Sequence, residues 1–335
     1  MKKSARVFIL VPIKMIASNK KMKWGAVDAE MELQIPYKFD WLGNFGNGLA
    51  PFSEKSKLGF CNEKGELIIS PKYDECMGFK NGLCAVAEGG LYGFIDATGK
   101  YVIPPRFQMA EPFFEGKACV KIGAKYGYVY PDGSWMLEPS LDGANSFSEG
   151  FAAVRKEGGF FFIDANGKQS GPLFDDECKS FTSGMALCQL NGVWLIVDNN
   201  FNTKSTLPEF DWVSLSAKDG LIMVSKKGNN GYGYADLQGQ IVLEPEFDEA
   251  LAFNEGCAAV RKGTSWAFVG ARQMKVKIIT NFQFDNIQIF KEGLAVCKLK
   301  TAYHFINADG NILTERFSNA QYFQSGLAPV QEYRK

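Results

Sequence analysis

The sequence predicts an all-β protein built from tandem repeats, because two sets of evenly spaced residues agree and apolar residues alternate with period two between them. The first set is mostly aromatic, and its steps are 34 residues five times, then 38, 34 and 37. Its members are Trp24, Leu58, Tyr92, Tyr126, Phe160, Trp194, Tyr232, Trp266 and Tyr303. The second set consists of glycines at positions 48, 82, 116, 150, 184, 220, 256, 293 and 326. Together they define nine copies of a unit of about 34 residues.

The first predicted strand of each unit follows this glycine. Its second residue is Ala in seven of the nine units, with Cys84 and Ile222 as the exceptions. Two positions later an apolar residue such as Val86 or Val120 faces the same side. Alternation with period two and β-branched residues is typical of a strand. The small residue on the inner side indicates that neighbouring backbones approach closely there.

Two further strands are predicted in each unit. The second is the "YGFID" segment from Tyr92 and its counterparts, and it ends in a turn such as "ATGK", whose Gly permits a positive φ. The third is "YVIPPRF" and its counterparts, which carry Pro at positions 36, 71, 105, 139, 208 and 245. Because Pro donates no backbone hydrogen bond, this segment is expected at a strand end or a sheet edge.

Each unit is therefore predicted to be a three-stranded antiparallel meander with a connector. Such a unit is too small to hold a core alone, so the copies must stack. A propeller blade normally uses about 40 residues or more for four strands, whereas about 34 residues fit three strands better. We therefore expect an open β-solenoid-like or superhelical stack, with a closed propeller-like toroid as the alternative.

The repeated pattern of an aromatic-Gly pair, "FID..GK", "PP.F" and "F.EG.A.V" resembles the WG repeat, also called the KWG repeat, of bacterial proteins. The resemblance covers roughly residues 23 to 330. Leu58 departs from it by replacing an aromatic residue, and Phe161, Leu195, Ala267 and His304 depart from it by replacing the Gly. The resemblance implies an all-β array with a binding or scaffolding role, and it implies no general enzymatic activity.

Charge is unevenly distributed along the chain. The sequence holds 37 basic and 37 acidic residues, but residues 1 to 23 contain seven basic residues and no acidic one. The remainder is mildly acidic, which argues against nucleic acid as the partner. We expect residues 1–22 to be a separate basic and apolar segment, either a strand that caps or joins the array or a weak signal-like sequence. Residues 23–335 form the predicted array, and no stretch is long enough for a transmembrane segment.

The cysteines and acidic residues favour structural roles over redox or metal chemistry. Five of the eight cysteines stand where other units carry Leu, Ala or Val, which favours small core residues in the reduced cytoplasm. Export is the alternative if the first 22 residues are a signal peptide. With no C-x-x-C and one His, no zinc site is expected. A row of Asp at 40, 74, 142, 175, 211, 248 and 285 offers oxygens for Ca²⁺, but hydrogen bonding at a strand exit explains it better.

No pattern predicts catalysis or a cofactor. His304 occupies the Gly position of unit nine, and no G-x-S-x-G surrounds a Ser. "KKGNNGYG" lies between predicted strands, and no GK[ST] follows it. We therefore predict that the protein is not an enzyme and has no catalytic, cofactor-binding or metal-binding residues.

Two functions fit such an array: a scaffold for protein–protein interaction, which we favour, and a carbohydrate or cell-wall binding module of an exported protein. Units five and six depart furthest from the repeat, and the next aromatic marker follows after 38 residues. We predict that a protein partner, whose identity the sequence leaves open, binds there through Trp212, Lys226 and Lys227, with Phe161 as a further candidate. Trp is common at binding hot spots, and Lys attracts an acidic partner.

Overall fold

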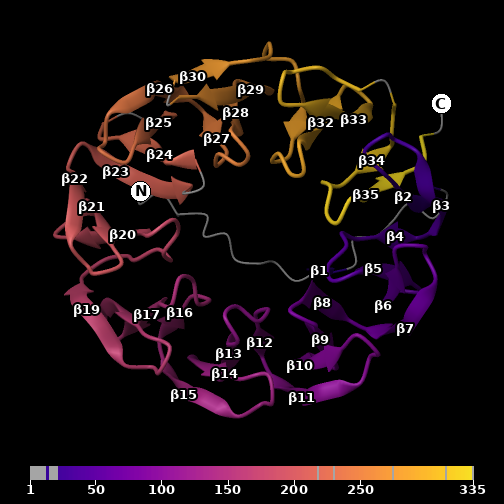
Figure 1. The fold of residues 1–335 in the computed structure, drawn as a ribbon, viewed down its shortest axis with the longest axis horizontal. Coiled ribbons are helices and arrows are strands. Elements are labelled where there is room, and N and C mark those ends of the chain that lie inside the picture. The colour runs from indigo at the N-terminus through magenta and orange to yellow at the C-terminus, as the bar shows by residue number, and fades with distance from the viewer. Residues whose placement is uncertain are drawn as a thin grey trace.

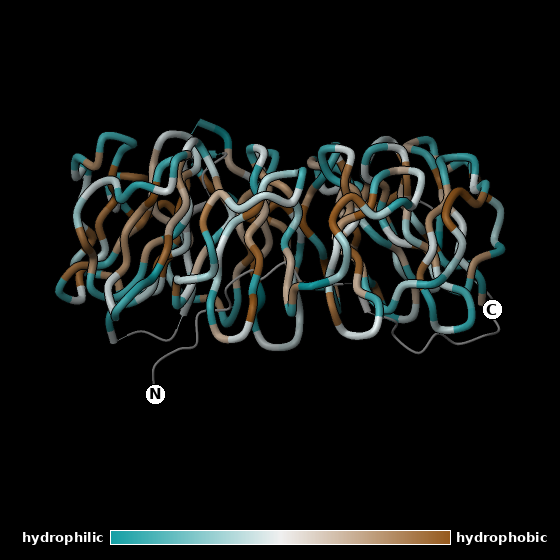
Figure 2. Tube along the Cα trace, turned by 90° about the horizontal axis from the view of Figure 1, so that it is seen from below, coloured by the Kyte–Doolittle hydropathy of each residue, from teal (hydrophilic) through white to brown (hydrophobic). Residues whose placement is uncertain are grey.

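The computed structural model describes residues 13–14, 22–216, 219–228, 231–273, 275–313 and 315–333. These residues form nine antiparallel sheets, which lie side by side in a closed ring (Figure 1). Seen from the side, the ring is flat, and its polar residues concentrate at the turns on both faces (Figure 2). We call each sheet a blade and number the blades 1 to 9 by the marker residue that each contains, from Trp24 to Tyr303.

The strands of the first four blades are given from the inner edge of the ring to the outer edge. Blade 1 contains β34 (Asn319–Ala320), β35 (Ala328–Gln331), β2 (Trp24–Val27) and β3 (Leu33–Phe39). Blade 2 contains β4 (Trp41–Leu42), β5 (Leu49–Glu54), β6 (Lys57–Asn62) and β7 (Leu67–Tyr73). Blade 3 contains β8 (Glu75–Lys80), β9 (Leu83–Glu88), β10 (Leu91–Asp96) and β11 (Tyr101–Phe107). Blade 4 contains β12 (Met109–Ala110), β13 (Ala118–Ile122), β14 (Lys125–Val129) and β15 (Trp135–Leu141).

The remaining blades follow the same order with more variation. Blade 5 contains β16 (Gly143–Ala144), β17 (Ala152–Lys156), β18 (Gly159–Ile163) and β19 (Gln169–Phe174), and blade 6 contains β20 (Met185–Leu190), β21 (Val193–Asp198) and β22 (Thr203–Leu207). Blade 7 contains β23 (Phe210–Ser216), β24 (Leu221–Lys226), β25 (Tyr232–Asp236) and β26 (Ile241–Phe247). Blade 8 contains β27 (Glu249–Ala250), β28 (Cys257–Lys262), β29 (Ser265–Arg272) and β30 (Lys275–Ile278), and blade 9 contains β31 (Asn286–Ile287), β32 (Leu294–Leu299) and β33 (Ala302–Asn307).

The ring is closed by a blade that takes strands from both ends of the described chain. In blade 1, β2 pairs antiparallel with β35, so that Trp24 lies opposite Gln331 and Val27 lies opposite Ala328. The amide of Glu332 also donates to the carbonyl of Lys23 at 3.1 Å. The all-β repeat array is therefore confirmed, whereas the open stack that we favoured is wrong and the closed toroid is right.

The expected count of three strands per unit is also wrong, because most blades carry a fourth strand at the inner edge. This strand is as short as two residues, as in β12, which pairs with β13 through Met109 and Ala110. It lies within the segment that we assigned to the connector. In blades 2, 4 and 5, four strands fit into about 34 residues because the innermost strand spans two residues.

Part of the predicted segment 1–22 joins the array. Strand β1 (Ile13–Lys14) pairs antiparallel with β8 and extends blade 3 at its inner edge. Ile13 lies opposite Cys76, and Lys14 lies opposite Glu75. Residues 1–12 and 15–21 lie outside the described residues, so the signal-like alternative stays a prediction.

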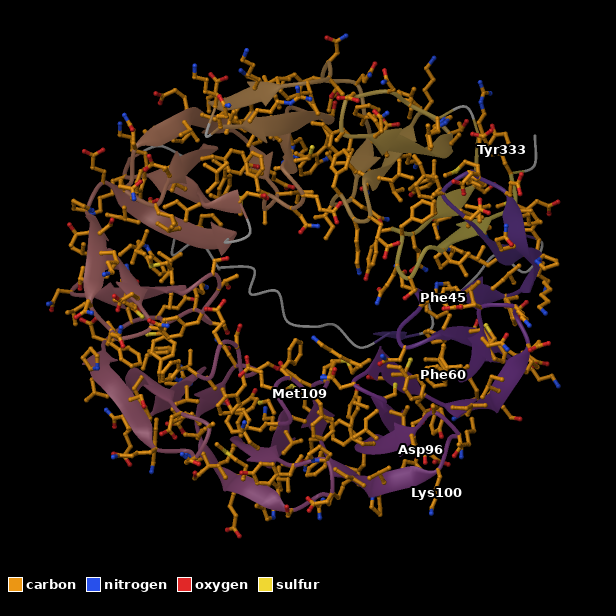
Figure 3. All side chains as sticks on the ribbon, viewed as in Figure 1. Phe45, Phe60, Asp96, Lys100, Met109 and Tyr333 are labelled. Carbon is orange, nitrogen blue, oxygen red and sulfur yellow. The ribbon has the colours of Figure 1, made fainter. Side chains whose placement is uncertain are left out.

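The hydrophobic core lies between neighbouring blades. Phe60 of blade 2 packs edge-on against Phe79 of blade 3 with ring centroids 4.9 Å apart. Phe94 of blade 3 packs against Phe113, which follows β12, with tilted rings whose centroids are 4.7 Å apart. Burying one such ring contributes about 2–3 kcal/mol. In Figure 3, Phe45 and Phe60 lie within the body of the ring, and Asp96 and Lys100 lie toward its outer edge.

The glycine after the aromatic marker has a steric reason. A Cβ built on Gly93 would lie 2.5 Å from the carbonyl oxygen of Ile103 in the outer strand β11. The register of β10 and β11 shifts there, because Tyr92 pairs with Phe107 but Phe94 pairs with Ile103. The outer strand therefore bulges and pushes a carbonyl group into the space of the missing side chain. Gly25, Gly59, Gly127 and Gly233 make the same close approach.

Candidate functional site

The repeated Asp after the outer strand holds two strands and a turn together. In blade 3, the Asp74 carboxylate accepts hydrogen bonds from Lys57 Nζ and from the amide of Gly89, the latter at 3.0 Å. The Lys57 ammonium is the main cause of the lowered pKa of Asp74. Lys23 with Asp40 and Lys125 with Asp142 form equivalent pairs. The predicted hydrogen-bonding role is confirmed for five members of the row, Asp40, Asp74, Asp142, Asp175 and Asp248, whose carboxylates accept hydrogen bonds from protein donors.

The Glu before the repeated glycine links neighbouring blades. Glu115 and Gly116 have φ values of 49° and 74°, which is typical of a two-residue hairpin turn. The Glu115 carboxylate accepts hydrogen bonds from the amides of Glu149 at 2.6 Å and Gly150 at 2.9 Å in the next blade. Glu255 binds the amides of Glu292 and Gly293 in the same way. We call the face of the ring that carries these turns the EG face.

The predicted binding residues Trp212, Lys226 and Lys227 all lie in blade 7. Trp212 pairs with Ser225 across β23 and β24, and Phe210 pairs with Lys226. Both lysine side chains are exposed. Trp212 is half-buried, and its ring packs edge-on against Tyr232 at 5.4 Å. The structure thus brings the three residues to one region, where Trp212 also has a packing role.

Phe161 does not belong to that region. It lies in β18 of blade 5, opposite Val154. Its half-buried side chain packs against a buried cluster that includes Tyr128 and Phe147. Phe161 therefore contributes to the contact between blades 4 and 5, two blades away from Trp212.

His304 and the cysteines are parts of the core. His304 is buried in β33 and lies opposite Cys297 in β32. Burial raises the pKa of the Cys297 thiol to about 12, which is the opposite of what an activated nucleophile requires. Among the residues that the structure describes, no three His, Cys, Asp or Glu side chains gather closely enough to hold a metal ion.

A cavity of about 540 Å³ opens on the EG face between blades 8 and 9. One wall is the hairpin of β29 and β30, which stays paired as far as Arg272 and Lys275. The turn of blade 9 at Ala308 and Asp309 and the EG turn of blade 8 at Gly256 also line the cavity. The amide of Ala271 donates to the carbonyl of Gly256 at 2.8 Å, which fixes the hairpin over its own blade.

This cavity arises where blade 8 departs from the repeat. Gly270 stands at the position of Asp96 in blade 3, so the turn that Asp96 caps is replaced by a longer hairpin. We did not identify this site from the sequence. The signal was present in the step of 37 residues between Trp266 and Tyr303 and in the absence of an Asp at position 270.

The outer strands of blades 1 to 3 each carry exposed aliphatic side chains. Leu33 on β3, Leu67 and Ile68 on β7, and Val102 on β11 are between 40% and 57% exposed. These three outer strands follow one another around the ring (Figure 1). Within the described part of the chain, Tyr130 is the one aromatic side chain among the exposed large hydrophobic residues.

Antiparallel blades of three to five strands, arranged in a ring that is closed by strands from both ends of the described chain, define a β-propeller-like protein. The chain matches the family described as WG containing repeat over residues 24–57, 59–92, 92–126, 126–160, 232–266, 276–299 and 305–335. These segments span well over half of the chain, and the protein therefore belongs to this family. The stretch from 161 to 231, which includes the divergent units five and six, lies outside the matched segments.

Solved structures are similar to this chain at low sequence identity, and the first of them, with a TM-score above 0.5, shares its fold. A crystal structure of the eukaryotic initiation factor aligns with a TM-score of 0.61 at 10% identity, covering 92% of this chain and 98% of that one. Streptogramin B lyase aligns with a TM-score of 0.39 at 11% identity, covering 93% and 97% of the two chains. Such identities show the fold alone. No curated protein matches this chain in sequence.

The described segments include no helix with the length and apolar character needed to cross a bilayer.

Proposed function

We propose that this ring is a non-enzymatic scaffold that binds a protein partner along the outer rim of blades 1 to 3. The observation that carries the proposal is the run of exposed aliphatic side chains at Leu33, Leu67, Ile68 and Val102. Contiguous exposed apolar surface on a soluble protein marks interaction sites. Pro36 and Pro71 in the same outer strands oppose continuous pairing with a foreign strand, so recognition there relies on side chains.

The surface chemistry supports a protein partner over a carbohydrate. Sugar-binding surfaces use exposed aromatic rings as stacking platforms, and Tyr130 alone offers such a ring among the exposed large hydrophobic residues of the described chain. The other aromatic side chains described are buried or half-buried. The repeated acidic groups Asp74 and Glu115 are engaged in contacts that build the ring. They support a scaffold rather than a reaction site.

Trp212, Lys226 and Lys227 remain a second proposed contact surface on blade 7. Lys226 and Lys227 are exposed and can attract an acidic partner. Trp212 is better left unchanged in a test, because its contact with Tyr232 makes a substitution at Trp212 ambiguous between folding and binding. The double change of Lys226 and Lys227 to Ala tests binding without removing the packing contact of Trp212.

The experiment compares rim variants by quantitative affinity capture with cross-linking from cells of the source organism. Leu67→Glu with Ile68→Glu should lower the recovery of a specific protein by about tenfold or more, as loss of a binding hot spot does. Leu173→Glu is the matched control, because Leu173 is an equally exposed outer-strand residue in blade 5. Unchanged recovery by a folded rim variant contradicts the rim proposal, and loss only in the Lys226 and Lys227 variant transfers the site to blade 7.

We further propose that the protein works in the cytoplasm. All eight cysteines are buried free thiols, and the sulfur atoms of Cys178 and Cys188 lie 3.0 Å apart without a bond. An oxidising compartment would favour linking such a pair. Fractionation of cells together with the intact mass of the protein tests this, and recovery of an exported form lacking its first residues contradicts it.

A further inference from the structure

The cavity between blades 8 and 9 carries more positive charge than the contacts of the ring require. Arg272 and Lys275 lie directly opposite each other at the end of the hairpin, and Lys277 lies opposite Gly270. All three charged side chains are exposed, and all three residues line the cavity. Like charges opposite each other on neighbouring strands are destabilising unless a counter-charge lies between them.

The acidic residues of the cavity compensate only part of this charge. Both carboxylate oxygens of Glu255 accept hydrogen bonds from the amides of Glu292 and Gly293, so this group is held by the backbone of blade 9. Asp309 approaches Arg272 at 3.4 Å, but both side chains are mostly exposed, and a pair of this kind contributes little. Within the described residues, no ion pair engages Lys275 or Lys277.

The remainder of the cavity is suited to an uncharged organic group. Ile279 and Ala308 contribute apolar surface, and Cys257 also lines the cavity. Burial raises the pKa of the Cys257 thiol to about 11, so it is neutral at physiological pH. The volume of about 540 Å³ lies within the range of small-molecule sites and is far larger than one phosphate ion needs.

We propose that this cavity binds a small organic phosphate. The phosphoryl group lies among Arg272, Lys275 and Lys277, where the Arg guanidinium gives paired hydrogen bonds and the two ammonium groups give point charges. The organic part lies against Ile279 and Ala308. The site is independent of the rim surface on blades 1 to 3, so either can fail without the other.

The test is isothermal titration of the full-length protein with a nucleoside monophosphate and, separately, with inorganic phosphate. The nucleoside monophosphate should bind at least about tenfold more tightly than inorganic phosphate, and its affinity should fall as salt is raised. Lys275→Gln with Lys277→Gln should weaken binding by about tenfold or more. Lys64→Gln with Lys168→Gln is the control, because it removes the same charge from exposed positions of blades 2 and 5 and should leave binding unchanged.

A second variant tests the same site by adding charge. Gly270→Asp restores the residue that other blades carry, and its Cβ would meet a side-chain atom of Ile279 at 3.3 Å, which a small shift accommodates. It should abolish binding while the ring stays folded. The proposal is overturned if the nucleoside monophosphate does not bind at about 10 mM, if both cavity variants bind it as the wild type does, or if an acidic peptide binds in its place.

Discussion

Blades 3 and 8 share the order of their four repeated strands, but their outer strands differ in how far they pair with the third strand. In blade 3, Gly93 admits the carbonyl of Ile103, and β11 stays paired with β10 as far as Phe107. In blade 8, Ala267 stands at the position of Gly93, and β30 pairs only from Lys275 to Ile278. The chain pairs with the third strand again at Phe284. The Phe284 amide donates a hydrogen bond to the carbonyl of Trp266, and the Phe284 carbonyl accepts one from the amide of Trp266.

The turns between the third and fourth strands differ in the same way. In blade 3, Asp96 caps the turn, and Gly99 packs against the side chain of Ile69 in blade 2. In blade 8, a longer hairpin rises beside the turn of blade 9 and forms the wall of a cavity. Blade 3 thus keeps its Gly and Asp, and its outer turn packs against blade 2, whereas blade 8 lacks both, and its outer hairpin lines a cavity.

The largest expected effect comes from opening the ring, because both kinds of blade depend on it. Deleting residues 328–335 removes β35, the partner of β2 in blade 1. We expect a loss of at least about 4 kcal/mol and a fall in Tm of roughly 10 °C or more. Thermal unfolding followed by circular dichroism measures it.

Deleting only residues 334–335 is the control for this truncation and should leave Tm unchanged. In an open stack, removing a terminal strand would fray one unit and leave the rest intact. A truncated protein that unfolds at the temperature of the full chain therefore contradicts the closing role of β35.

The second prediction exchanges the residue that distinguishes blade 3 from blade 8. Gly93→Ala places a Cβ 2.5 Å from the carbonyl oxygen of Ile103 and 2.8 Å from the nitrogen of Pro105. Because both contacts are backbone atoms, the outer strand must shift, and we expect a loss of about 2–3 kcal/mol. Ala267→Gly in blade 8 should cost only about 1 kcal/mol from lost burial and added chain freedom. Urea unfolding compares them, and equal losses would contradict the steric role of Gly93.

The repeat, its strands and its turns could be predicted from the sequence because their signals are local. The alternation after Gly82 identifies β9, and the spacing from Asp96 to Gly99 identifies a capped turn. Pro at 105 indicates an outer strand, and β11 is one. These signals depend on residues that are close together in the chain.

The closure and the cavity could not be predicted, because they depend on contacts between distant residues. The pairing of Trp24 with Gln331 joins residues at opposite ends of the described chain, and no local pattern of residues specifies which strand pairs with which. Inner strands such as Met109–Ala110 are too short to show an alternation. The candidate residues were chosen from irregular units, yet the structure separates Phe161 from Trp212 and places the cavity in another irregular unit, at Arg272.

A third prediction concerns the contact between blades at the EG face. Glu115→Ala removes the carboxylate that binds the amides of Glu149 and Gly150. Because these bonds are exposed, we expect a loss of about 1 kcal/mol. Glu157→Ala is the control, because Glu157 likewise has a positive φ, 53°, and precedes a Gly, but its carboxylate has no hydrogen-bond partner among the described residues. Urea unfolding of both variants should show a loss only at Glu115, and equal losses would assign the effect to the turn backbone.

The smallest expected effect is pH-dependent and concerns Glu111, which follows β12 in the regular blade 4. Burial raises the pKa of this carboxyl, and the hydrogen bond from the Ser146 hydroxyl opposes the rise. A raised pKa in the folded state means that the charged form is disfavoured. The free-energy cost of burying the carboxylate is therefore present above the folded pKa and disappears as the pH falls and the group binds a proton.

Glu111→Gln, which keeps an acceptor for Ser146, should therefore stabilise the protein at pH 8 by less than about 1 kcal/mol and have almost no effect at pH 4. Glu138→Gln is the control for the loss of one negative charge, because it makes the same substitution at an exposed position on β15. Unfolding at both pH values decides it, and a Glu111→Gln variant that is destabilised at pH 8 would mean that the carboxylate, not its protonated form, is what blade 4 requires.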